Sequence, residues 1–128
     1  MASKFVLIVD DDLGVQEAIR DALEDEGHDV AVASNGDVAL RQLRSGVHPD
    51  LIVLDHMMPV MDGPTFVSEV LKDPALQGLP IVLLTADGRA DTKAAAMGVQ
   101  AYLRKPLRIE QLLAILDQGV AARAEEPD

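Results

Sequence analysis

The chain has 128 residues, enough for one domain with a buried core and too few for two. Apolar residues make up 48% of it, which excludes a disordered chain, and its formal net charge of −11 disfavours binding to nucleic acid or to anionic membrane surfaces. It contains no cysteine, so disulfides and thiolate metal sites are excluded. Because no apolar stretch reaches membrane-spanning length and no signal-peptide pattern opens the chain, we expect a cytoplasmic protein.

Strand and helix patterns alternate five times along the chain. Short, continuously apolar runs predict buried parallel strands. These predicted strands are residues 5–9, 30–32, 51–54, 81–84 and 101–103. Between and after them, apolar residues recur at helical spacing, with Asp12 placed as an N-cap and glycines placed as stops. The helices are predicted between Asp12 and Gly27, between Gly36 and Gly46, and over residues 66–71, 89–97 and 109–120.

The alternation predicts an α/β fold, a (βα)₅ doubly wound parallel sheet with right-handed crossovers. The strand order does not follow from the spacing of the elements. The flavodoxin-like order 2-1-3-4-5 is typical of a domain of this size, and it places the first and third strands side by side. We expect residues 1–4 to be an N-terminal extension, residues 5–120 the domain, and residues 121–128 a disordered acidic tail.

Acidic residues follow two of the predicted strands. Asp10, Asp11 and Asp12 come directly after the first strand, and Asp55 comes directly after the third. Ligands bind at the carboxyl ends of the strands in open α/β sheets, so these side chains should meet there. Like charges a few Å apart repel by roughly 4 kcal/mol per pair at an effective dielectric near 20. We therefore interpret Asp12 as the helix cap and Asp10, Asp11 and Asp55 as candidate functional residues.

Two further polar residues belong to the same edge of the sheet. Thr85 comes directly after the fourth predicted strand, and Lys105 follows the fifth. Three carboxylates, a hydroxyl and an ammonium group suit phosphoryl transfer to a carboxylate. A divalent cation offsets the negative charge, one carboxylate attacks in line, and the hydroxyl and ammonium groups bind the remaining phosphoryl oxygens.

Four stretches of the sequence resemble the receiver domain of bacterial two-component response regulators, in a likeness that covers about residues 4–120. These stretches are residues 9–12, 54–63, 84–86 and 102–106. The resemblance implies that Asp55 accepts the phosphoryl group. It also implies that Asp10, Asp11 and Asp55, with the backbone carbonyl of Met57, hold Mg²⁺, for which Mn²⁺ can substitute.

The same resemblance assigns roles at the fourth and fifth strands. Thr85 and Lys105 would bind the phosphoryl group, and Tyr102 would change its rotamer when Thr85 moves. The bond between Lys105 and Pro106 is expected to be cis, which would direct the lysine into the site. Tyr102 has a second interpretation, as a residue that only fills the core.

The function implied by the resemblance is that of a signalling switch rather than a conventional enzyme. A sensor histidine kinase or a phosphotransfer protein would supply the phosphoryl group from a phosphohistidine, and the chain would later dephosphorylate itself. Its output would be a changed surface for a downstream protein, formed by residues 89–120. We expect a monomer or a phosphorylation-dependent dimer, and either a stand-alone receiver or the N-terminal part of a longer regulator.

Other classes of protein fit the residues less well. A constitutive binding module, a pseudo-receiver, would usually lack an acid, the threonine or the lysine of the site, and all are present here. A phosphatase of the haloacid-dehalogenase type would need a second aspartate where Met57 stands. A nucleotide-binding domain would need a glycine-rich turn after the first strand, where three aspartates stand.

Overall fold

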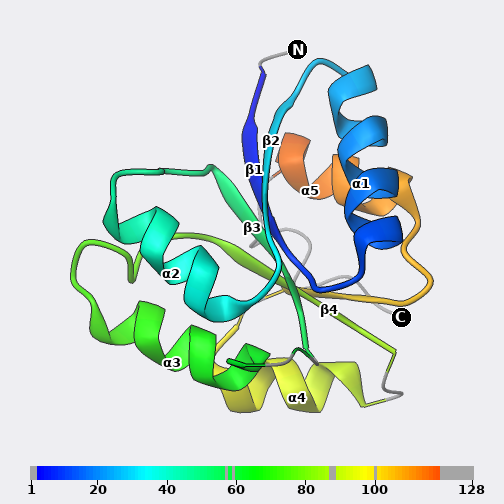
Figure 1. Cartoon of the computed structure of the whole chain (residues 1–128). Coiled ribbons are helices and arrows are strands. Elements are labelled where there is room, and N and C mark those ends of the chain that lie inside the picture. The colour runs from blue at the N-terminus through cyan, green and yellow to red at the C-terminus, as the bar shows by residue number, and fades with distance from the viewer. Residues whose placement is uncertain (1–2, 57, 59, 87–88, 100, 119–128) are drawn as a thin grey trace.

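A computed structural model describes residues 3–56, 58, 60–86, 89–99 and 101–118. In this part of the chain five parallel strands form one sheet in the order β2-β1-β3-β4-β5, and five helices alternate with them (Figure 1). The strands are β1 (Phe5–Val9), β2 (Asp29–Ala33), β3 (Leu51–Asp55), β4 (Ile81–Thr85) and β5 (Ala101–Arg104). The helices are α1 (Leu13–Asp25), α2 (Gly36–Arg44), α3 (Gly63–Lys72), α4 (Ala90–Met97) and α5 (Ile109–Gln118). The predicted flavodoxin-like fold and strand order are confirmed.

Helices cover both faces of the sheet. In Figure 1, α1 and α5 lie on one side, and α2, α3 and α4 lie on the other. Strand side chains alternate between these faces: Val6 and Ile8 pack toward α1 and α5, whereas Leu7 and Val9 pack toward α2 and α3. Because both faces are covered, the central strands are apolar throughout, which is the pattern seen in the sequence.

Short polar side chains begin the first three helices. The carboxylates of Asp12 and Asp62 accept from the backbone N–H groups of Val15 and Thr65, at 3.1 and 2.9 Å, and Asn35 caps α2 in the same way. The predicted cap at Asp12 is confirmed. Gly98 ends α4 in the left-handed conformation, with φ at 79°, which a residue without Cβ adopts freely.

The element boundaries lie close to those predicted. β3, β4 and β5 each extend one residue beyond the predicted strand, and β2 extends by one at both ends. The predicted extension of the last helix to residue 120 and the predicted tail lie outside the described residues, as does the start of the N-terminal extension. Within the described ranges, none of the helices combines the length and apolar character needed to cross a bilayer.

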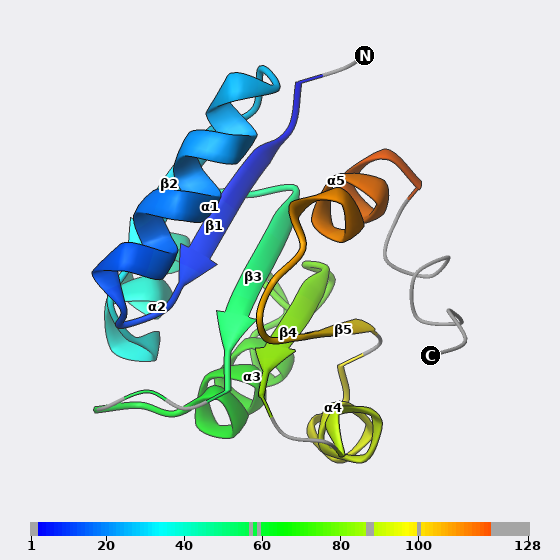
Figure 2. The ribbon, with the colours of Figure 1, turned by 90° about the vertical axis from the view of Figure 1, so that its right-hand side faces the viewer.

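The strands all run in one direction, so their carboxyl ends share one edge of the sheet. Figure 2 shows β1, β3 and β4 with their arrowheads toward the same side, where the connections to α1 and α3 leave the sheet. Val9 of β1 is paired with Leu54 of β3, so Asp10 and Asp55 occupy the next position on neighbouring strands. The register therefore places the candidate acids beside one another.

Candidate functional site

Asp10, Asp11 and Asp55 lie together at the carboxyl edge of the sheet, as predicted. Each offers one carboxylate oxygen to a set in which all these atoms lie within 4.8 Å of one another. Asp10 and Asp55 are buried, and Asp11 is exposed. The cluster therefore has a buried floor and an open side, through which a ligand can approach.

Hydrogen bonds hold the backbone N–H, the backbone carbonyl and one carboxylate oxygen of Asp10. Its N–H donates to the carbonyl of Ala33 at 3.1 Å, and its carbonyl accepts from Nε2 of Gln16. Its Oδ1 accepts from the backbone N–H of Asp12 at 2.9 Å. Its Oδ2 is buried and has no hydrogen-bond partner among the residues that the structure describes.

The electrostatics of Asp10 follow from this position. Burial raises the pKa of its carboxyl above the ordinary 3.8, and the negative charges of Asp55 and Asp11 raise it further. The hydrogen bond from Asp12 and the charge of Lys105 oppose these effects without cancelling them. Asp10 is thus a carboxylate that a nearby cation would stabilise.

Lys105 supplies a positive charge at the site. Its Nζ lies 2.8 Å from Oδ1 of Asp55, and its side chain is 33% exposed. Partial burial by itself would lower the pKa of Lys105, but the hydrogen bond and charge of Asp55, with the charges of Asp10 and Asp11, raise it overall. The lysine is therefore an ammonium ion bound to Asp55. The expected cis bond between Lys105 and Pro106 is confirmed.

Thr85 and Tyr102 lie beside the acids on the neighbouring strands. Thr85 is buried at the end of β4, one residue beyond Leu84, which is paired with Asp55. Its carbonyl accepts from the backbone N–H of Lys105 at 2.9 Å, so the ends of β4 and β5 are joined. Tyr102 is half-buried against the α2–α3–α4 side of the core, the face on which strand alternation also places Thr85. Met57, expected to contribute a carbonyl oxygen, lies outside the described residues.

The backbone that carries Asp55 is fixed by its neighbours. The N–H of His56 donates to the carbonyl of Leu84 at 3.1 Å, and the carbonyl of His56 accepts from the N–H of Gly63 at 3.1 Å. A Cβ at Gly63 would lie 3.0 Å from that same carbonyl oxygen, so the close approach requires glycine. The start of α3 is thereby packed directly against the segment after Asp55.

Sequence reasoning missed Gln16 and the packing role of Gly63. Gln16 lies three residues before Ile19 and seven before Leu23, on the buried stripe of α1. A polar residue on an apolar stripe is the pattern that could have drawn attention to it. No local pattern distinguishes a glycine of close approach from an ordinary turn glycine, so the role of Gly63 needed the structure.

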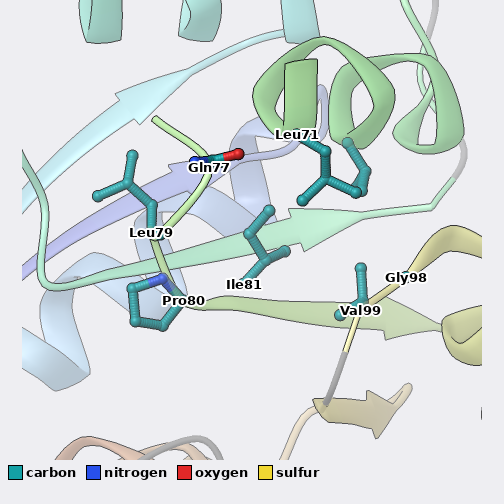
Figure 3. Close-up of a pocket in the computed structure, with 9 residues that line it drawn as sticks. Leu71, Gln77, Leu79, Pro80, Ile81, Gly98 and Val99 are labelled. Carbon is teal, nitrogen blue, oxygen red and sulfur yellow. The ribbon is translucent and has the colours of Figure 1, made fainter. Parts of the chain in front are cut away.

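Among the cavities in the described part of the chain, one has Lys105, the partner of Asp55, in its wall. An apolar groove of about 280 Å³ runs between α1 and the segment after β5, with Val15, Ala22 and Leu107 in its walls beside Lys105. A cavity of about 330 Å³ lies at the opposite edge of the sheet, between the end of α3, the start of β4 and the turn after α4 (Figure 3). The residues that line the second cavity include no titratable side chain, so we place the chemistry at the acidic cluster.

The acidic cluster has the properties of a site for a hard divalent cation. Carboxylate oxygens at this spacing are the ligands that Mg²⁺ prefers, and they leave room for the water molecules that it retains. The buried Oδ2 of Asp10, which has no partner among the described residues, has lone pairs available for such an ion or for its water. The residues present therefore fit Mg²⁺.

Comparisons with known proteins show which family the chain resembles. The family model described as the response regulator receiver domain matches residues 6–117. The chain is 36% identical over 126 residues to the DNA-binding response regulator MtrA of Mycobacterium tuberculosis, covering 95% of this chain and 53% of MtrA. It is 38% identical over 120 residues to an uncharacterised 14.6 kDa protein of Leptolyngbya boryana, covering 92% and 91%.

A solved structure supports the same assignment. The chemotaxis response regulator CheY4 of Vibrio cholerae is similar with a TM-score of 0.82 and 31% identity, covering 91% of this chain and 98% of that one. The chain spans about half the length of MtrA, whose DNA-binding activity belongs to the longer protein. The family match, the fold and the acidic edge of the sheet agree, and this chain belongs to the receiver-domain family of two-component response regulators.

Proposed function

We propose that this chain is a phosphorylation-controlled switch in which Asp55 accepts a phosphoryl group from the phosphohistidine of a sensor histidine kinase or phosphotransfer protein. The observation that carries the proposal is the 2.8 Å contact between Lys105 and the buried Asp55, beside two further carboxylates within 4.8 Å. The receiver would comprise residues 5–120. Family membership and the donor set support this function, and the roles of the individual residues are part of the proposal.

The chemical step uses the residues at the end of β3, β4 and β5. A carboxylate oxygen of Asp55 attacks phosphorus, an O–P bond forms, and the N–P bond breaks with its electron pair returning to the donor imidazole. Lys105 and the hydroxyl of Thr85 would bind the phosphoryl oxygens. Water later cleaves the acyl phosphate, which releases inorganic phosphate and restores the carboxylate.

Mg²⁺ would be held by Asp10, Asp11 and Asp55, with the carbonyl of Met57. The ion would offset the charge of the acids and of the incoming phosphoryl group. Mn²⁺ takes similar oxygen ligands and can substitute for it. In the protein without phosphate, Lys105 already binds one oxygen of Asp55. Phosphorylation would give this ammonium new oxygens on the same side chain. The lysine would therefore remain at the site and change its partner atom.

The output of the switch would come from the face formed by α4, β5 and α5. Among the described residues, no side chain caps the start of α4, whereas α1, α2 and α3 each have a side-chain cap. Such a helix is easier to shift or to unwind at its start. A phosphoryl group that contacts Thr85 and Lys105 better in one arrangement would favour that arrangement, and Tyr102 would follow Thr85.

The phosphodonor would be a protein with an apolar surface around its histidine. The groove of about 280 Å³ beside Lys105 presents mainly aliphatic side chains of α1 and of the segment after β5. A helix of the donor could bury this surface while its phosphohistidine reaches Asp55. The net charge of −11 again favours a protein rather than a nucleic acid as the direct partner of this chain.

Covalent labelling tests the proposal. Incubation with acetyl phosphate and Mg²⁺ should add one phosphoryl mass, and the adduct should be labile to base and hydroxylamine. Asp55→Asn should abolish the adduct because an amide is not a nucleophile here. Asp50→Asn is a matched control, because Asp50 immediately precedes β3, at the other edge of the sheet, and its substitution should leave labelling intact. Lys105→Ala should slow labelling or uncouple it from the surface change.

Two outcomes would contradict the proposal. Labelling of Asp55→Asn at the wild-type rate would show that another residue is the acceptor. A folded wild-type protein that takes no label from acetyl phosphate or from a phosphorylated histidine-containing donor would point to the constitutive binding module instead.

A further inference from the structure

Gln16 is a buried polar residue that the phosphoryl chemistry does not use directly. It lies in the first turns of α1 and is 5% exposed, on the stripe that also buries Ile19 and Leu23. Burial of an amide is unfavourable unless it is hydrogen-bonded, and Nε2 of Gln16 donates to the backbone carbonyl of Asp10. The side chain therefore links α1 to the residue at which β1 enters the acidic cluster.

The direction of the Asp10 carboxylate depends on its main chain. The N–H of Asp10 is bound to Ala33 of β2, and its carbonyl is bound to Gln16 of α1. Asp11 follows directly, so the orientation of the peptide between the two acids sets where both carboxylates point. Among the described residues, the side chain of Gln16 donates a hydrogen bond to this carbonyl.

We propose that Gln16 is a positioning residue for Mg²⁺-dependent phosphorylation. By holding the carbonyl of Asp10, it keeps the carboxylates of Asp10 and Asp11 within reach of Asp55. This inference rests on the proposed function, because it assumes that the acidic cluster binds the cation. Gln16 itself touches neither the cation nor the phosphoryl group.

The chain provides a matched control in Gln42. Its Nε2 donates to the backbone carbonyl of Val32 at 3.2 Å, so it makes the same kind of bond from α2 to the sheet. Gln→Met has nearly the same shape and removes the donor in both cases. If the role of Gln16 is purely structural, Gln16→Met and Gln42→Met should both lower the melting temperature and leave the affinity for Mg²⁺ unchanged.

The positioning role predicts a difference between these variants in Mg²⁺ binding measured by calorimetric titration. Gln16→Met should raise the Mg²⁺ dissociation constant by about tenfold or more, in the range found when residues supporting metal ligands are removed. Gln42→Met should keep the wild-type dissociation constant. With acetyl phosphate, Gln16→Met should need correspondingly more Mg²⁺ for half-maximal rate and approach the wild-type rate at saturation, because Asp55 and Lys105 are intact.

Gln16→Glu separates positioning from simple electrostatics. An added negative charge near a cation site would by itself tighten Mg²⁺ binding. Positioning predicts weaker binding at pH 8, because a carboxylate cannot donate to the carbonyl of Asp10 and repels it. If Gln16→Met is unfolded, Gln16→Asn replaces it. This variant keeps the amide but shortens the side chain, and it should also bind Mg²⁺ more weakly than wild type.

The inference is overturned if Gln16→Met binds Mg²⁺ as wild type does, or if Gln16→Glu binds it more tightly. Either result would leave the proposed function standing, because wild type would still bind the ion. Absence of Mg²⁺ binding by wild type would overturn the proposed cation site itself, and this inference with it.

Discussion

Replacing Asp10 by Asn should stabilise the Mg²⁺-free protein. The substitution removes a buried negative charge and keeps the shape of the side chain. Its carbonyl oxygen can still accept the hydrogen bond that Oδ1 accepts from the N–H of Asp12. The amide nitrogen takes the place of Oδ2, which is buried without a partner among the described residues. A hydrogen-bond donor then faces the neighbouring acids where an acceptor stood before.

The size of the effect follows from the spacing of the charges. The carboxylate oxygens lie within 4.8 Å of one another, and two unit charges at that distance repel by roughly 3.5 kcal/mol at an effective dielectric near 20. Lys105 offsets part of this repulsion, and Asp11 is exposed, so solvent and salt screen its share. We therefore expect Asp10→Asn to raise the free energy of unfolding by about 1 to 2 kcal/mol at pH 7 and low salt.

The gain should depend on pH in a definite direction. Burial, together with the charges of Asp55 and Asp11, holds the pKa of the Asp10 carboxyl above its ordinary value of 3.8 in the folded protein. The folded state thus binds this proton more readily than the unfolded state, and stability falls as the pH rises through the interval above 3.8. The advantage of Asp10→Asn should be small below that interval and complete at neutral pH.

Urea unfolding in EDTA and in MgCl₂ measures both effects. In Mg²⁺ the order should reverse, because wild type gains about 2.7 kcal/mol when the free ion is at 100 times its dissociation constant, and the variant binds the ion poorly. Asp50→Asn is the control: Asp50 accepts from the N–H of Phe5 at 2.8 Å at the opposite edge, and its substitution should not change the response to Mg²⁺. The reasoning is refuted if Asp10→Asn is less stable than wild type in EDTA at pH 7, or if Mg²⁺ stabilises both proteins equally.

Three further predictions concern the surroundings of the site. Asp62→Ala should cost about 1 kcal/mol in urea unfolding at pH 7, because the carboxylate caps α3. The hydrogen bonds from Thr65 lower the pKa of Asp62, so this cost should shrink as the pH falls below 3.8, and an equal cost at pH 3 would contradict the role. Gly63→Ala should destabilise the protein by about 1 to 3 kcal/mol and slow labelling of Asp55, because the added Cβ would lie 3.0 Å from the carbonyl oxygen of His56, the residue after Asp55. A variant as stable as wild type would refute this prediction. Tyr102 is the only tyrosine and tryptophan is absent, so the ultraviolet emission reports on this residue. Beryllofluoride with Mg²⁺ should change the tyrosine emission and reduce its quenching by acrylamide, and Asp55→Asn should abolish both changes. Identical quenching with and without beryllofluoride would mean that Tyr102 only fills the core.

Local patterns determined the elements and the edge at which the acids lie. Continuous apolar runs, the caps at Asp12 and Asn35 and the stop at Gly98 depend on neighbours a few residues away, so they can be read along the chain. The meeting of Asp10 with Asp55 was predictable for a different reason. Parallel strands place their carboxyl ends at one edge, so residues at the ends of adjacent strands must lie close together.

The order of the strands and the contacts of the site were decided by tertiary structure. The order 2-1-3-4-5 was expected because it is typical of this size and of the family that the sequence resembles, and not because the spacing of the elements required it. The 2.8 Å contact of Lys105 with Asp55, the bond from Gln16 to Asp10 and the approach of Gly63 to the strand join residues from separate elements. Such contacts depend on side-chain direction and on how helices pack on the sheet, which the pattern of one segment does not contain.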